Sequence, residues 1–222
     1  MARRVWALTA PECEFRTRET DKEIGMTKLQ EAPQDIVDTF LPTIFENDAK
    51  GILADLLAQP ALAMHFMDFS KTETMRAIRH VVGILEECYR AGHLKVAVSH
   101  ENGRLYGYAI FFVHPDPSIS RYCHKIFVFE PYRGHGIGTK LLNGVLDYSQ
   151  GTCLLCNHDL IPFYERAGLQ LKGDFTPPTS QQGFALTRDM YVDLAIMGSP
   201  GVEGSSPVFM LNDDDIKQLL SI

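Results

Sequence analysis

The residues best suited to chemistry lie in one short segment, residues 126–138, which reads IFVFEPYRGHGIG. An apolar strand pattern there runs through alternating glycines into the pattern of an amphipathic helix. Glycines let a backbone approach a bulky anion, and the free amides and positive dipole at the start of a helix favour phosphate groups. The segment therefore predicts a binding site for a ligand that carries phosphate.

Two widespread phosphate-binding loops do not fit this segment. The dinucleotide fingerprint Gly-x-Gly-x-x-Gly requires a glycine where Thr139 stands. The nucleoside-triphosphate loop requires lysine before serine or threonine, whereas here Thr139 precedes Lys140. Neither class of nucleotide site is expected.

The segment instead resembles the coenzyme A loop of the GNAT acyltransferase superfamily, whose signature Arg/Gln-x-x-Gly-x-Gly/Ala is met by residues 133–138. A second family feature follows at the expected distance, and it consists of Asn157, Leu160, Phe163, Tyr164, Glu165, Arg166 and Gly168. The resemblance covers roughly residues 26–196 and is most specific over 126–169. It implies a site for acetyl-CoA, the acyl donor, with no metal.

The resemblance also implies which residues bind the cofactor. The backbone of Phe127 and Val128 would pair with the pantetheine arm, with the Val128 amide facing the thioester carbonyl. Asn157 would hydrogen-bond the pantetheine amide region. The pyrophosphate would be held by the backbone amides of Arg133, Gly134, His135, Gly136, Ile137, Gly138 and Thr139.

Two residues are candidates for acid–base catalysis. Tyr164 matches the family's tyrosine near the sulfur, and a phenol with an ordinary pKa of ~10 can protonate a thiolate. His124 could deprotonate the amine directly or through water, since imidazole titrates near neutrality. Tyr164 as a core aromatic beside Phe163, and His124 as a half-exposed strand residue, are the alternatives.

Three features depart from the family pattern. The proline before the loop, Pro131, comes one place late. Residues 122–125 occupy the strand position at which many relatives carry a catalytic glutamate, which leaves the general base open. The apolar segment 52–69 is long; its cluster 64–69 could line an acceptor pocket or simply pack.

The implied function is coenzyme A-dependent N-acyl transfer, with acetyl moved from acetyl-CoA to an amine of a small molecule or protein by direct attack. The alternative is a non-catalytic acyl-CoA-binding regulatory module of the same fold, because the strand glutamate is missing. The 21 basic and 28 acidic residues give a net charge of −7. That balance disfavours nucleic acid and anionic membrane as partners and suits a cationic acceptor.

Hydrophobic periodicity gives the elements that must position these residues. Helices are expected over 34–45, with a kink or break at Pro42, over 52–57 and over 74–90. Strands 94–98 and 105–114 form a hairpin, and further strands and helices are expected at 126–129, 141–146, 152–156, 161–166 and 184–196. By resemblance the fold class is α/β (α+β), a GNAT-like mixed, mostly antiparallel sheet flanked by helices, with a splayed central strand pair.

Length and composition predict one domain with tails, since 222 residues with 45% hydrophobic content suffice for one core. The predicted division is an arm at 1–25, the acyltransferase domain at 26–197, and a flexible linker with a short helix at 198–222. That helix, capped by Asn212 or Asp213, would dock on its own domain, on a partner or in a homodimer.

The expected compartment is the cytoplasm, because no apolar run resembles a membrane span or signal peptide. The five cysteines read as reduced thiols, and Cys153 and Cys156 should point to opposite faces of one strand.

Overall fold

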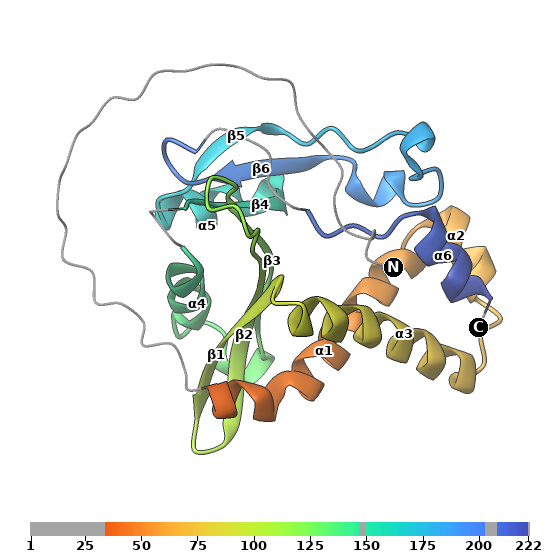
Figure 1. Ribbon diagram of the computed structural model, residues 1–222, viewed down its shortest axis with the longest axis horizontal. Helices are drawn as coiled ribbons and strands as arrows, with labels where there is room; N and C mark the ends of the chain where they lie inside the picture. Colours follow the sequence, from red (N-terminus) through yellow and green to blue (C-terminus); the bar gives the residue numbers. More distant parts are fainter. Residues whose placement is uncertain (1–33, 147–149, 203–207, 222) are drawn as a thin grey trace, which may run out of the picture.

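The computed structural model describes residues 34–146, 150–202 and 208–221, so the predicted arm at 1–25 and Cys13 lie outside the described residues. One six-stranded sheet lies between two layers of helices (Figure 1). The strand order is β1 (Leu94–Glu101), β2 (Arg104–Phe112), β3 (Arg121–Val128), β4 (Thr152–Asn157), β6 (Leu194–Gly198), β5 (Gln170–Asp174). Only β3 and β4 run parallel, which confirms the predicted mixed, mostly antiparallel sheet.

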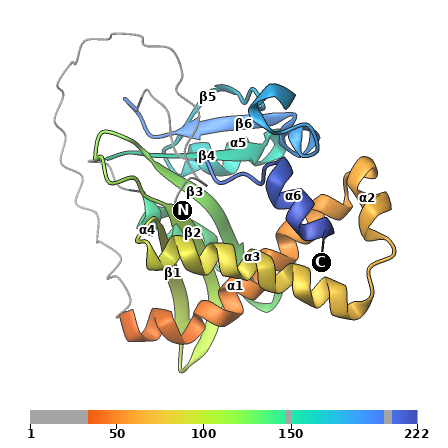
Figure 2. The same ribbon diagram turned by 45° about the vertical axis from the view of Figure 1, so that its right-hand side comes forward.

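Helices cover both faces of the sheet (Figures 1 and 2). One face, called here the α1 face, packs against α1 (Gln34–Leu57), α2 (Pro60–Phe66), α3 (Lys71–Arg90) and α6 (Asp213–Leu220). The other, called the α4 face, packs against α4 (Ile137–Val145) and α5 (Ile161–Arg166). Cys153 packs on the α1 face and Cys156 on the α4 face, as their spacing predicts. No helix among the described residues is long and apolar enough to cross a membrane.

Helix α1 is continuous, so the predicted helices over 34–45 and 52–57 are one helix, and a break at Pro42 is wrong. Pro42 lies inside the helix on its exposed side, where water can satisfy the carbonyl that loses its amide partner. The buried stripe continues past the proline without a change of phase, and it consists of Val37, Ile44, Phe45, Asp48, Ala49, Ile52, Leu53 and Leu56. Packing of this stripe on the sheet outweighs the local cost of the proline.

Helix α3 and the following hairpin form as predicted. Ser70 caps α3 in a capping box, accepting from the Glu73 amide while the Glu73 carboxylate accepts from the Ser70 amide at 2.7 Å. The helix therefore begins three residues before the predicted Thr74. Asn102 and Gly103, both with positive φ, make the tight turn that joins β1 to β2.

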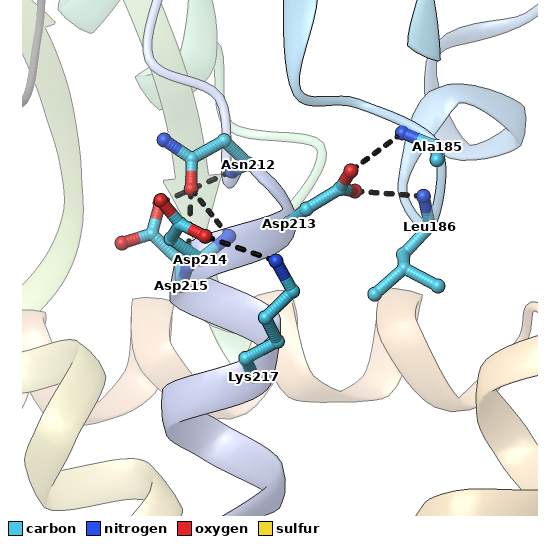
Figure 3. A network of polar contacts seen from close by, with 7 residues as sticks. All are labelled: Ala185, Leu186, Asn212, Asp213, Asp214, Asp215 and Lys217. Carbon is cyan, nitrogen blue, oxygen red and sulfur yellow. Dashed lines mark hydrogen bonds and ion pairs between the residues drawn. The ribbon is translucent and has the colours of Figure 1, made fainter.

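The last two strands differ from the prediction of one strand at 184–196. Only Leu194–Gly198 is a strand, and residues 184–191 make turns instead. The amides of Ala185 and Leu186 donate to the Asp213 carboxylate at 3.0 and 2.8 Å rather than to a neighbouring strand (Figure 3). The edge strand β5 was not predicted, because its side chains are mostly exposed and show no apolar alternation.

The C-terminal segment packs into the protein's own core. Asn212 caps α6, and Ile216 and Leu219 are fully buried on the α1 face. Phe209 stacks on Phe112 with ring centroids 5.2 Å apart. Gly198, the first residue of the predicted tail, is the last residue of β6, and the apolar side chains of α6 belong to the cluster on the α1 face. Of the predicted alternatives for this helix, docking on its own domain is the one that the described residues display.

Candidate active site

The glycine loop connects the end of β3 to the start of α4. After one turn at Glu130–Tyr132, Gly134 and Gly136 adopt φ values of +81° and +73°, which glycine reaches without strain. The Arg133 Nε donates to the Val128 carbonyl at 3.0 Å and ties the loop back to the strand. This brings the loop directly over the end of β3.

Gly136 is the N-terminal cap of α4, and the first backbone bond runs from the Lys140 amide to its carbonyl at 3.1 Å. The amides of Ile137, Gly138 and Thr139 belong to the first helical turn, where no carbonyl of the same helix is available to them. The loop from 133 to 136 is exposed to solvent. An anion with several oxygens could therefore bind these amides at the positive end of the helix dipole.

Strands β3 and β4 diverge close to their start. They pair only at Arg121 with Thr152 and at Tyr122 with Cys153, while β3 stays paired with β2 as far as Val128. Beyond Tyr122, the β4-facing edge of β3 has unpaired backbone groups that can bind an extended ligand. This confirms the predicted splayed pair, and Phe127 and Val128 lie on the diverging part.

Two predicted residues, Asn157 and Tyr164, lie across that gap from β3. Asn157 is the last residue of β4, is exposed, and caps nothing with its side chain. Tyr164 lies on α5 and packs on the α4 face, with its ring 5.0 Å from that of Phe163. Burial, followed by the nearby Cys123 and Cys156 thiols, raises the pKa of the Tyr164 phenol. Tyr164 therefore stays protonated and can donate a hydrogen bond across the physiological pH range.

His124 sits at an irregularity of β3, on the other face. Ile110 pairs with Lys125 and Phe111 with Cys123, so His124 is the extra residue of a β-bulge. Its side chain is 14% exposed, and its ring lies among the aromatic rings of Phe112, Tyr122 and Phe209. His124 is thus a strand residue, as the alternative reading has it, and its side chain is more buried than that reading expects. One nitrogen of the ring also faces a carboxylate.

That carboxylate belongs to Asp48, which the sequence reading missed. The His124 Nε2 lies 3.1 Å from Asp48 Oδ2, and the Asp48 side chain is fully buried. The sequence does contain a signal for Asp48. It stands at helical spacing within the stripe of α1 whose other buried residues are apolar. A carboxylate at such a position requires a buried partner, which sequence alone could not identify.

The bulge explains why the side chains of His124 and Lys125 face the same carboxylate. Two successive strand residues normally point to opposite faces, but a bulge turns both to one side. Lys125 Nζ accordingly lies 3.9 Å from Asp48 Oδ1, which has no hydrogen-bond partner. Burial alone would raise the pKa of Asp48, but His124 and Lys125 together lower it below its ordinary value. Asp48 is therefore ionised at neutral pH.

The structure brings some predicted residues together and separates others. Gly138 lies against Val128 and Phe163, so the loop, the strand end and α5 meet. His124 packs on the α1 face and Tyr164 on the α4 face, so the two side chains lie on opposite faces of the sheet. In the cluster 64–69, Phe66 and Phe69 line a small hollow with residues of α1 and α3, whereas Met64 and Met67 are 76% and 75% exposed.

His135, another predicted residue, is exposed in the loop, and only its backbone has a defined place. Among the residues that the structure describes, no group of three acidic, histidine or cysteine side chains is arranged to hold a metal ion. The site thus offers backbone amides, one phenol and one imidazole–carboxylate pair.

A family model matches the part of the chain that contains the glycine loop. Residues 62–169 match the model of the acetyltransferase (GNAT) family. No curated protein matches the chain. The match spans α2 to Leu169 and includes the glycine loop, Asn157 and Tyr164.

Three solved structures similar to this chain are distant from it in sequence. PaiA N-acetyltransferase from Thermoplasma acidophilum, in complex with coenzyme A, is 13% identical over 77% of this chain and 96% of its own, with a TM-score of 0.42. A variant of spermidine N-acetyltransferase SpeG from Vibrio cholerae is 17% identical over 55% and 74%, with a TM-score of 0.42. A GNAT-family acetyltransferase, described as putative, from Desulfovibrio desulfuricans is 16% identical over 76% and 92%, with a TM-score of 0.39.

Proposed function

Since residues 62–169 match the model of the acetyltransferase (GNAT) family, we propose that the chain is a coenzyme A-dependent N-acyltransferase that moves acetyl from acetyl-CoA to an amine. The observation that carries the proposal is the glycine loop at the start of α4, beside the diverging strands β3 and β4. The loop suits a pyrophosphate, and the free strand edge suits the amide groups of a pantetheine arm. The proposed domain includes α6, whose apolar side chains share the same core.

The cofactor would lie with its phosphates on the amides of residues 133–139 and its thioester between the strands. Backbone groups of Phe127 and Val128 would bind the pantetheine arm, and Asn157 would bind it from β4. Acetyl-CoA supplies the acyl group as a thioester, and this chain's residues bind it and move protons around it. Oriented backbone donors lower the barrier by stabilising charge that develops on the thioester oxygen.

The transfer requires proton movement at two atoms. The amine attacks the thioester carbon, and the new C–N bond replaces the C–S bond. His124 takes the proton that leaves the nitrogen, and the Tyr164 hydroxyl donates to the sulfur that departs. The raised pKa of Tyr164 makes full proton release costly, so hydrogen bonding to the thiolate is its main contribution.

The acceptor class, a homodimer contact and a cytoplasmic location stay predictions from the sequence. Thiol release from acetyl-CoA tests the function directly, with polyamines, aminoglycosides and lysine-containing peptides as acceptors. The net charge of −7 leads us to expect the fastest release with polycationic amines. Binding of acetyl-CoA without release for any acceptor would favour the non-catalytic regulatory module, which the missing strand glutamate keeps as the second candidate.

A further inference from the structure

Asp48 is a fully buried carboxylate on α1 that no binding or catalytic role described so far explains. We infer that Asp48 is the positioning residue of the general base: it orients His124 and stabilises its protonated form during acyl transfer. This inference rests on the proposed function. It assigns a carboxylate to the general base of a chain that lacks the strand glutamate. Asp48 lies on α1, 76 residues before His124 in the sequence.

The contact determines which imidazole nitrogen acts as the base. An ionised carboxylate only accepts hydrogen bonds, so the Nε2 that faces Asp48 Oδ2 at 3.1 Å carries its hydrogen. The neutral ring then has its free lone pair on Nδ1. His124 thus presents Nδ1 to the amine while Asp48 holds the opposite side of the ring.

The surroundings of Asp48 and His124 favour a role for this pair in acyl transfer over a role in stability alone. Burying a carboxylate is costly unless all of its oxygens are satisfied, yet Asp48 Oδ1 has no hydrogen-bond partner and its nearest cation, Lys125 Nζ, is 3.9 Å away. An apolar residue would continue the stripe of α1 without that cost. The ring also packs edge-on against Phe112 and Phe209, with centroids 5.9 and 5.1 Å away.

The proposed step balances in protons and electrons. The amine nitrogen forms its bond to the acyl carbon and gives one proton to His124 Nδ1. The C–S electron pair leaves with sulfur, which accepts a hydrogen bond or proton from Tyr164. Asp48 stays ionised throughout and interacts more strongly with the imidazolium than with the neutral ring. Solvent later removes the proton from His124 and restores that of Tyr164.

The test is the kinetics of Asp48→Asn in two backgrounds. In the otherwise wild-type protein we expect kcat to fall about 10- to 100-fold, as when a group that orients a histidine is removed, with the KM for acetyl-CoA unchanged. In the His124→Gln background the same substitution should change kcat no further, because Asp48 acts through His124. Asp55→Asn removes an exposed charge from the same helix and is the matched control.

Two results would overturn the inference: an unchanged kcat in the wild-type background, or an equal fall in both backgrounds. The ¹⁵N spectrum of the wild-type imidazoles adds a test that needs neither activity nor a stable variant. His124 should show the Nε2–H tautomer, and an Nδ1–H tautomer would contradict the pair. Absence of transfer by the wild type would refute the proposed function, whereas the tautomer would still report on Asp48 and His124.

Discussion

The two faces of the sheet contribute to the candidate site by different means. On the α4 face the principal groups are backbone amides, placed by Gly134 and Gly136 over one short stretch of chain. On the α1 face they are side chains from three distant segments, namely Asp48, His124 and Phe209. Cofactor binding on the α4 face should therefore depend on backbone conformation. Proton transfer on the α1 face should depend on the chemistry of single side chains.

The largest effect is expected on the α1 face. His124→Gln keeps a polar side chain but removes the titrating nitrogen, and general bases contribute about 10²- to 10⁴-fold to rate. We expect kcat to fall within that range while calorimetry gives an unchanged affinity for acetyl-CoA. His65→Gln, on the exposed side of α2, is the control. Turnover at the wild-type rate would show that this face contributes no base.

The next effect tests the α4 face through its backbone. Gly136→Val has room for its side chain but must adopt φ near +73°, at about 1–3 kcal/mol, so we expect about 10- to 100-fold weaker acetyl-CoA binding.

Gly92→Val is the matched control, since Gly92 has φ of +78° and equally open surroundings but lies at the end of α3. It should lower thermal stability without changing affinity. Equal losses of affinity in both variants would mean that the loop has no special role.

A smaller effect is expected from Tyr164→Phe. A hydrogen bond to a charged group contributes roughly 1.5–3 kcal/mol, and we expect the lower end of that range, a fall in kcat of about tenfold, with unchanged affinity. Burial already disfavours ionisation of this phenol, which limits what the hydroxyl can add. Tyr106→Phe, which removes an exposed hydroxyl bonded to Glu101, is the control. A loss of affinity equal to the loss in kcat would mean that Tyr164 serves binding and not transfer.

The smallest effect concerns how the tail is held on the α1 face. Asp213→Asn leaves one carbonyl oxygen where two carboxylate oxygens accept the amides of Ala185 and Leu186 (Figure 3). Losing one of these hydrogen bonds should lower the free energy of unfolding by about 1–2 kcal/mol and Tm by roughly 2–8 °C for a protein of this size. Asp214→Asn removes the same charge from the same turn but only an exposed pair with Lys217. An equal shift in both variants would assign the effect to helix charge alone.

The loop, the hairpin and helix α5 could be predicted because their signals are local. Alternating glycines, a turn sequence and helical spacing each lie within a few residues, and tertiary contacts only confirm them. The splayed pair came from the family resemblance.

The features that could not be predicted from the sequence depend on contacts between distant segments. Asp48 finds its partner through the packing of α1 on the sheet, and Phe209 through the return of the tail. The turns at 184–191 form because Asp213 binds their amides, which no local pattern indicates. Helix α1 continues past Pro42 because packing along its length outweighs the missing bond.

Titration calorimetry of the wild-type protein with acetyl-CoA tests the central claim most directly, because every proposed role depends on the cofactor occupying the loop at the start of α4. The account predicts saturable binding at one site per chain, with competition by coenzyme A. No binding of either compound would contradict it.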